Sequence, residues 1–281
     1  MRDDLPTVSF PSSITVPALG IGTWKMGEDP ETVPNEVESI RAALEAGWSV
    51  VDTAEMYGEG GAELVVGAAL RGCRDKAFVV SKVYPWNAST QGVQDACARS
   101  LERLAIDKID LYLLHWRGDV PLTETVAGME ILRQQGLIGA WGVSNFDVDD
   151  MEELFSIPGA ENCAANQVLY NAARRGIEFD LLPWCQERGL PVMAYSPLGQ
   201  GDLLHHKEII RLSKAYQATP AQIALAFVLE RDGVLAIPKT SRPDRIRELN
   251  EAVDLEISDE DWAELDRALP PPASKKPLEM K

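Results

Sequence analysis

Eight short apolar runs recur along the chain, at intervals too long for hairpin turns. Most are rich in Val, Ile and Leu throughout instead of alternating with polar residues, which is typical of strands covered on both faces. We interpret these runs as parallel strands at residues 19–24, 49–54, 77–83, 111–115, 139–145, 164–168, 192–197 and 234–240.

Amphipathic stretches separate these strands and predict helices. They lie at residues 36–46, 91–104, 122–135, 147–155, 177–188 and 220–230. Thr219 before Pro220 and Asp147 after a polar run are typical helix N-caps. Eightfold alternation of strands and helices predicts an α/β fold, namely a closed (β/α)8 TIM barrel. We expect residues 1–281 to form a single domain, because 281 residues is an ordinary length for such a barrel. An open doubly wound sheet is the alternative, but Gly20 and Gly22 supply only half of its G-x-G-x-x-G signature.

Two segments lie outside the eight units. Val8–Phe10 and Ile14–Val16 flank Pro11-Ser12-Ser13 and predict an N-terminal hairpin that caps the bottom of the barrel. Residues 259–268 predict an extra C-terminal helix, and we expect the Pro-rich tail at about 270–281 to be mobile.

Composition excludes several classes of partner. The net charge is −17 and no run of Lys and Arg exceeds two residues, which argues against binding nucleic acid or an anionic membrane. No apolar segment resembles a secretory signal or approaches the ~18 residues of a membrane span, so we expect a cytoplasmic protein. The four cysteines and three histidines show no metal-ligand spacing, so we expect reduced thiols and no metal.

Polar and aromatic residues end every predicted strand. The active site of a (β/α)8 barrel lies at the carboxyl ends of its strands, so these residues should share one rim. In chain order they are Trp24, Asp52, Lys82, His115, Ser144-Asn145, Gln167, Tyr195-Ser196 and Lys239.

Asp52, Tyr57, Lys82 and His115 are the catalytic candidates. An ammonium beside a tyrosine is expected to lower its pKa, a carboxylate keeps the lysine charged, and an imidazole can donate to a carbonyl oxygen. Taken singly, Asp52 could be a helix cap, Lys82 a solvated charge, and His115 a core histidine. Together they suit proton delivery to a developing alkoxide.

The chain resembles the aldo-keto reductases from about residue 8 to residue 270. The resemblance lies in GTWKMG, VVDTAEMYGEG, VSKV, LYLLHW, GVSNF, NQV, AYSPLGQG and IPKTSRPDR, in the family's order and spacing. It implies that Tyr57 donates the proton, that Lys82 and Asp52 tune it, and that His115 positions the carbonyl. EMYGEGGAE, VYPWNA and RGIEFDLLPWC further resemble small bacterial members that reduce methylglyoxal.

The resemblance also implies NADPH as cofactor and a set of residues that contact it. These are Gly22, Thr23, Trp24 and Asp52, with Ser144, Asn145 and Gln167 for the carboxamide, Tyr195 for the nicotinamide face, Ser196, Leu198, Gly199, Gln200 and Gly201 for the pyrophosphate, Lys239, Thr240 and Arg245 for the 2′-phosphate, and Glu248 for the adenine. Leu249 stands where the family usually has Asn, with Asn250 one position later. On a helix that shift rotates the side chain by roughly 100°, which puts the adenine contact in doubt.

The expected function is therefore NADPH-dependent reduction of small aldehydes and ketones, 2-oxoaldehydes such as methylglyoxal first, without an obligate protein partner. Trp24, Trp86 and Trp116, beside Tyr57 and His115, are expected to form a small aromatic substrate pocket. One alternative is a nicotinamide-nucleotide-sensing module with little turnover. Another is an unrelated barrel enzyme in which Lys82 forms a Schiff base.

Overall fold

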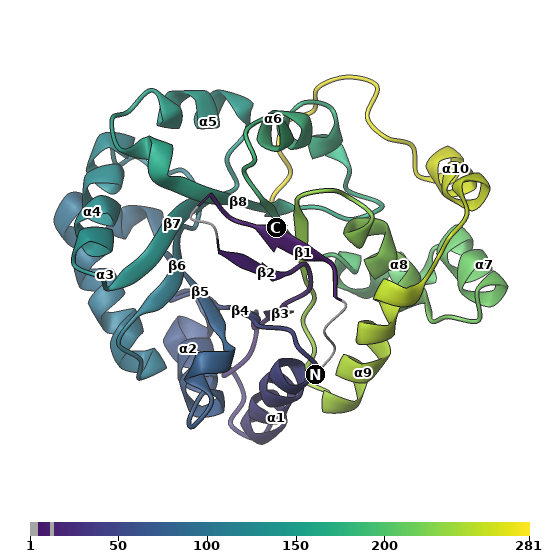
Figure 1. Ribbon diagram of the computed structural model, residues 1–281, viewed down its shortest axis with the longest axis horizontal. Coiled ribbons are helices and arrows are strands. Elements are labelled where there is room, and N and C mark those ends of the chain that lie inside the picture. The colour runs from purple at the N-terminus through teal and green to yellow at the C-terminus, as the bar shows by residue number, and fades with distance from the viewer. Residues whose placement is uncertain (1–4, 12–13) are drawn as a thin grey trace.

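The computed structural model describes residues 5–11 and 14–281. One sheet contains eight strands in chain order, and every neighbouring pair is parallel (Figure 1). The strands are β3 (Ile21–Gly22), β4 (Val50–Asp52), β5 (Phe78–Val83), β6 (Ile109–Leu114), β7 (Ile138–Ser144), β8 (Cys163–Leu169), β9 (Val192–Tyr195) and β10 (Val234–Ile237).

The first and last strands of this sheet also meet. The Ala236 backbone donates to the Ala18 carbonyl at 2.8 Å and accepts from the Gly20 amide at 2.9 Å. A parallel bridge joins Leu19 to Ala236 in the same place. The sheet is thus closed into the predicted (β/α)8 barrel, and the open doubly wound alternative is wrong.

Helices surround the barrel (Figure 1). They are α1 (Val33–Glu45), α2 (Gly61–Ala69), α3 (Thr90–Leu104), α4 (Leu122–Gln134), α5 (Val148–Phe155), α6 (Leu181–Glu187), α7 (Lys207–Ala215), α8 (Pro220–Leu229), α9 (Pro243–Asn250) and α10 (Asp259–Ala268). All six predicted helices and the extra C-terminal one are present, whereas α2, α7 and α9 were not predicted. The predicted segment 177–188 is divided, because Asp180 caps a new helix by accepting from the Leu181 amide at 2.9 Å.

Both predicted N-caps are confirmed as capping boxes. The Thr219 hydroxyl accepts from the Gln222 amide at 3.2 Å, and the Gln222 side chain returns a bond to Thr219. Asp147 and Asp150 make the same reciprocal pair at the start of α5. These caps satisfy amide groups that a helix start leaves without partners.

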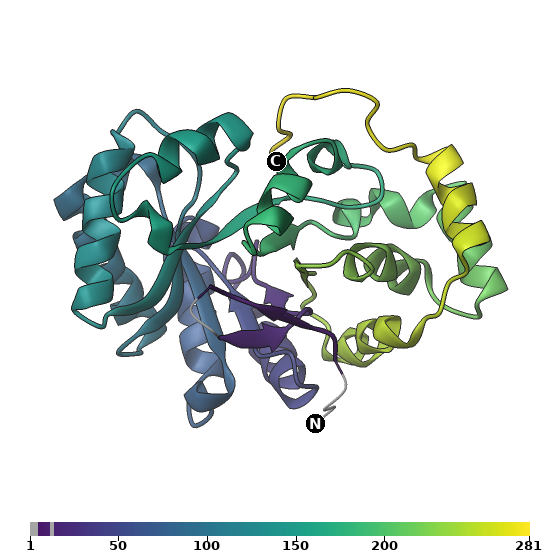
Figure 2. The same ribbon diagram turned by 45° about the horizontal axis from the view of Figure 1, so that its top comes forward.

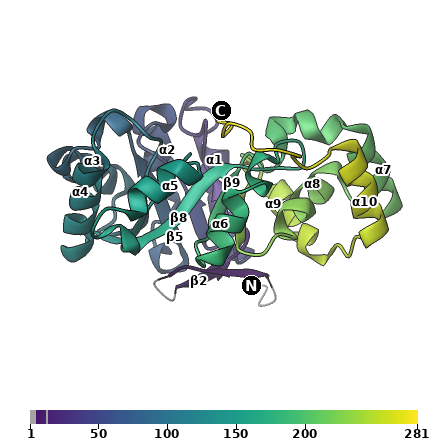
Figure 3. The ribbon, with the colours of Figure 1, turned by 90° about the horizontal axis from the view of Figure 1, so that it is seen from above.

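The inside of the barrel is a separate core, closed at one end by the hairpin of β1 (Thr7–Ser9) and β2 (Thr15–Pro17). Phe10 stacks on Phe78 at the start of β5, with ring centroids 5.3 Å apart. Figure 3 shows this hairpin across one end of the barrel, opposite the C label. The predicted cap on the barrel bottom is thus confirmed, although Ser12 and Ser13 of its turn lie outside the described residues. The hairpin covers that end of the barrel, and a cavity opens at the other end, beside the carboxyl ends of the strands.

The last segment returns across the open end of the barrel. Beyond α10, residues 270–281, which we call the tail, run back toward the strand ends (Figures 1 and 2). The expected mobility of the tail stays a prediction. Among the described residues, no helix is long and apolar enough to cross a membrane.

Candidate active site

A cavity of about 480 Å³ opens at the carboxyl ends of the strands. Thirteen of the predicted cofactor residues line it, and so do Tyr57 and His115 from the catalytic set. The thirteen are Gly22, Trp24, Asp52, Ser144, Asn145, Gln167, Tyr195, Ser196, Leu198, Gln200, Gly201, Lys239 and Arg245.

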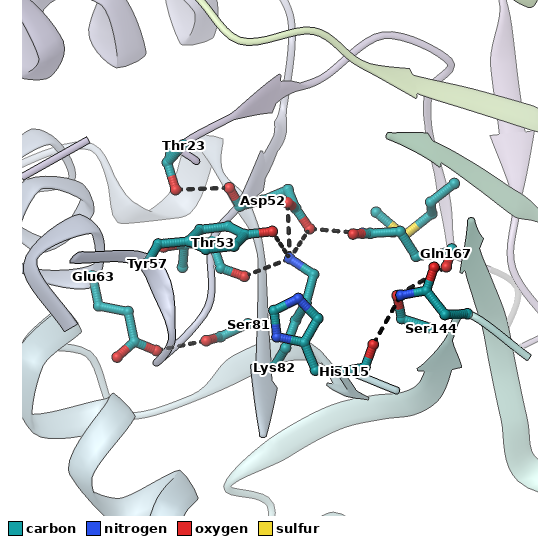
Figure 4. A network of polar contacts seen from close by, with 12 residues as sticks. Thr23, Asp52, Thr53, Tyr57, Glu63, Ser81, Lys82, His115, Ser144 and Gln167 are labelled. Carbon is teal, nitrogen blue, oxygen red and sulfur yellow. Dashed lines mark hydrogen bonds and ion pairs between the residues drawn. The ribbon is translucent and has the colours of Figure 1, made fainter. Parts of the chain in front are cut away.

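Lys82 is the centre of the polar network beneath this cavity (Figure 4). The residue is fully buried on β5, and its Nζ donates to Asp52 Oδ1 and Oδ2 at 2.8 and 2.9 Å. It also reaches the Thr53 carbonyl at 2.7 Å and the Tyr57 hydroxyl at 3.2 Å. Adjacent parallel strands supply Asp52 and Lys82, which explains why residues thirty positions apart meet.

The environment of Tyr57 favours the protonated phenol. Burial raises the pKa of Tyr57 well above 10.0, and the negative charge of Asp52 raises it further. Burial also lowers the pKa of Lys82, against the opposing effect of Asp52. The expectation that Lys82 lowers the pKa of Tyr57 is therefore wrong: removal from water outweighs the neighbouring ammonium. Tyr57 consequently holds its proton at neutral pH.

His115 is neutral at the same pH. Burial, and then the charge of Lys82, lower the pKa of His115 well below 6.5. Its Nδ1 is buried and, among the described residues, has no hydrogen-bond partner. The ring meets that of Tyr57 edge-on at 5.8 Å between centroids. A neutral imidazole retains one N–H, so His115 can donate to an oxygen that also faces Tyr57.

Amide side chains join the catalytic network to the opposite wall of the cavity. Gln167 Nε2 donates to Asp52 Oδ1 at 2.8 Å, and the Gln167 carbonyl accepts from Ser144 Oγ at 2.9 Å. Asn145 Nδ2 donates to the His115 carbonyl at 3.1 Å, and Asn145 Oδ1 accepts from the Tyr195 hydroxyl at 3.0 Å. These groups come from the ends of β7, β8 and β9, where a carboxamide and a planar ring could be held.

The segment after β9 lines the cavity and contains several left-handed residues. Four residues have positive φ: Ser196 (50°), Gly199 (60°), Gln200 (58°) and Gly201 (100°). Such left-handed turns direct successive amides toward an anion. With Lys239 and Arg245 lining the same cavity, the residues present fit a phosphorylated dinucleotide.

Four predicted cofactor residues do not line the cavity. Three of them are engaged in bonds within the protein: Thr23 Oγ1 donates to the Asp52 carbonyl at 2.9 Å, Thr240 Oγ1 accepts from the Arg242 amide at 3.1 Å, and the Glu248 carbonyl accepts from Gln222 Nε2 at 2.7 Å. The fourth is Gly199.

The structure shows what Leu249 and Asn250 do in place of the family's usual Asn at position 249. Leu249 is buried in the core, and Asn250 Oδ1 accepts from Trp48 Nε1 at 2.7 Å. Asn250 therefore stabilises the packing of α9 on the segment after α1.

Aromatic rings continue outward from His115. Trp116 lies 4.9 Å from His115 and 5.7 Å from Trp86, which stacks on Tyr84 at 4.1 Å, all between ring centroids. Trp86 and Trp116 do not line the cavity at the strand ends, and Trp86 is 64% exposed. They form an open wall beside the site, whereas Trp24 lines the cavity itself.

Sequence reasoning missed several lining residues, namely Lys25, Met56, Pro197, Leu204, Ile237, Pro238 and Lys281. Four of them adjoin residues that were predicted, and Ile237 is the last residue of β10, so strand-end position could have identified these five. Leu204 and Lys281 belong to irregular segments and carried no such signal.

Comparison with known proteins agrees with this geometry. The model of the aldo/keto reductase family matches residues 18–270. The chain belongs to the aldo-keto reductase family. This aldo-keto reductase is 49% identical to the methylglyoxal reductase YeaE of Escherichia coli, over 97% of this chain and 98% of that protein. It is 33% identical to the glyoxal reductase of Bacillus subtilis, over 92% and 91%.

A solved structure is equally similar. The aldo/keto reductase of Klebsiella pneumoniae in complex with NADP and acetate superposes with a TM-score of 0.96 at 50% identity. The match covers 99% of this aldo-keto reductase and all of that chain. The predicted barrel and the predicted family are both confirmed.

Proposed function

We propose that this aldo-keto reductase uses NADPH to reduce small aldehydes and ketones to alcohols, with 2-oxoaldehydes such as methylglyoxal among its substrates. The observation that carries the proposal is the buried Lys82 ammonium, which holds both Asp52 and the Tyr57 hydroxyl at the floor of the cavity. Similarity to a methylglyoxal reductase and a glyoxal reductase supports the substrate class.

The chain supplies the proton and the orientation of the substrate. Tyr57 and His115 face one point in the cavity, where both can donate to the carbonyl oxygen. A bound nicotinamide would supply the hydride to the carbonyl carbon. As negative charge grows on the oxygen, Tyr57 transfers its phenolic proton there, because an alkoxide is a stronger base than a phenolate. Lys82 then stabilises the phenolate through the same 3.2 Å contact.

Charge at the far end of the cavity supports a preference for NADPH over NADH. Lys239 and Arg245 line that end, and a 2′-phosphate is the group that would recruit two cations. Ser144, Asn145 and Gln167 are proposed to hold the carboxamide, Tyr195 to stack on the ring, and the segment 196–201 to hold the pyrophosphate.

The open aromatic wall supports a small and weakly selected substrate. Trp24, Trp86 and Trp116 offer apolar surface without enclosing it. Every proposed catalytic and cofactor residue comes from one chain, so we propose that no obligate protein partner is needed. Free cysteines support action in the reducing cytoplasm.

Lys82 is poorly suited to Schiff-base chemistry. Its Nζ is buried and bonded to Asp52 and the Thr53 carbonyl, so no lone pair faces a substrate. Borohydride treatment with a carbonyl substrate should leave Lys82 unmodified.

The test is NADPH oxidation by the wild type and by Tyr57→Phe with methylglyoxal and a panel of short aldehydes. We expect the variant to lose most turnover while NADPH still binds, because only the proton donor is removed. A wild type that binds NADPH but turns over no carbonyl would favour the nucleotide-sensing alternative. Equal turnover by the two proteins would refute the role of Tyr57.

A further inference from the structure

The tail is attached to the open end of the barrel by charge pairs. Lys275 Nζ lies 3.5 Å from Asp147, 3.6 Å from Asp149 and 3.3 Å from Asp180, at the starts of α5 and α6. Further along, Glu279 pairs with Arg174 at 2.6 Å. Two separate anchors therefore fix the direction of the tail before it reaches the cavity.

Lys281 ends this path inside the candidate active site. Its backbone amide donates to the Tyr195 hydroxyl at 3.3 Å, and its Nζ donates to Gln200 Oε1 at 3.4 Å. Lys281 also lines the cavity at the strand ends. The residue thus bridges the proposed nicotinamide platform and the proposed pyrophosphate loop, across the line that a dinucleotide would follow.

Few positive charges around the cavity are available to attract an anionic cofactor, so the Lys281 ammonium can contribute to binding it. The protein has a net charge of −17, which repels an anionic cofactor. Among the described residues that line the cavity, four carry a cationic side chain: Lys25, Lys239, Arg245 and Lys281. Lys25 lies over the Trp24 ring at 4.6 Å. Lys281 is the one that contacts the positive-φ segment after β9.

We propose that Lys281 is a cofactor-binding residue and that the tail is a latch, in which the Lys281 ammonium moves from Gln200 to the pyrophosphate and slows release of the dinucleotide. The Gln200 contact is a long bond to a neutral oxygen, so exchange for a phosphate oxygen strengthens it. The inference rests on the proposed function, because it presumes that NADPH occupies this cavity.

The experiment compares wild type, Lys281→Gln and Lys276→Gln. Lys276 lies in the same tail but does not line the cavity, so its substitution is the matched control for loss of one charge. The dissociation constant and release rate of NADPH are measured from protein fluorescence, and binding of adenosine 2′-monophosphate is measured in parallel. That probe has the 2′-phosphate but lacks the pyrophosphate.

We expect Lys281→Gln to raise the dissociation constant and the release rate of NADPH about three- to tenfold, the effect of one partly solvated charge pair. Binding of adenosine 2′-monophosphate should be unchanged, and Lys276→Gln should match the wild type. Lys275→Gln, which releases the first anchor, should weaken NADPH binding in the same direction.

Other outcomes overturn the latch in distinguishable ways. Unchanged NADPH binding by Lys281→Gln refutes it and leaves the proposed function standing. Tighter binding shows that the tail obstructs the cofactor. Equal weakening of both nucleotides shows a general effect of charge. Failure of the wild type to bind NADPH refutes the latch and the proposed function together.

Discussion

Replacing Lys82 with Met tests whether the buried ion pair organises the site. The Lys82 and Asp52 side chains are 0% and 3% exposed, so the substitution leaves a carboxylate buried without its cation. Breaking such a pair costs about 3–5 kcal/mol. The cost should lie in the lower part of that range, because Gln167 still donates a hydrogen bond to Asp52 at 2.8 Å. With about 2–4 °C lost per kcal/mol in domains of 150–250 residues, the Tm should fall by about 6–20 °C.

The assay is thermal unfolding of four proteins: wild type, Lys82→Met, Asp52→Asn and the double variant. The double variant buries no net charge, so it should be more stable than the sum of the two single changes predicts, by about 2 kcal/mol or more. Tyr57→Phe is the control, because it loses only a 3.2 Å contact and should melt close to the wild type. Losses that add within about 0.5 kcal/mol would show that the two groups are not coupled and would refute the reasoning.

Three further predictions concern pH, cofactor preference and a helix cap. The pKa of His115 lies well below 6.5 in the folded protein, so below about pH 6.5 the unfolded chain binds a proton that the folded protein does not. The stability of the wild type should therefore fall relative to that of His115→Gln between about pH 7 and pH 5, by up to about 1.4 kcal/mol per pH unit. The same dependence of Tm on pH in both proteins would contradict this. Arg245→Met should raise the dissociation constant of NADPH about tenfold or more, because a bond between charged groups is lost, and should leave that of NADH unchanged. An equal effect on the two dissociation constants would show that Arg245 does not contact the 2′-phosphate. Thr219→Ala removes a cap from α8 and should cost about 1 kcal/mol in urea unfolding, whereas Thr219→Ser should cost little; equal losses would show that the hydroxyl does not matter.

Strands were predictable because their surroundings leave a simple pattern. The residues of β4 and β5 are all buried, and that burial selects short apolar runs such as Val50-Val51 and Phe78–Val80. Three helices, α2, α7 and α9, were not predicted, and one of them, α2, lacks a comparable pattern. The α2 helix is buried on most sides, and a Cβ at Gly67 would meet the Leu104 carbonyl at 2.6 Å, so close packing replaces the polar face that identifies an amphipathic helix.

Positions in the site were predictable where the barrel itself fixes them. Asp52, Lys82, His115 and Gln167 follow from the rule that strand ends share one rim. The sign of the pKa shift at Tyr57 was not predictable in this way, because it depends on how completely the phenol is removed from water. The reach of Lys281 to Tyr195 also had no sequence signal, since 86 positions separate them and the tail has no regular structure.

The bond from Gln167 to Asp52 constrains how this enzyme could be redesigned. On the proposed roles, the Gln167 amide binds the carboxamide of the nicotinamide and also orients the Asp52 carboxylate, which is bonded to Lys82. A substitution at Gln167 that accommodates a different redox carrier would therefore disturb proton delivery at the same time. Among the described residues, Lys239 and Arg245 line the same cavity without a hydrogen bond to Asp52, Tyr57, Lys82 or His115. On the proposed roles, substitutions at Lys239 and Arg245 can therefore change the preference between NADPH and NADH without disturbing proton delivery, whereas substitutions at Gln167 cannot.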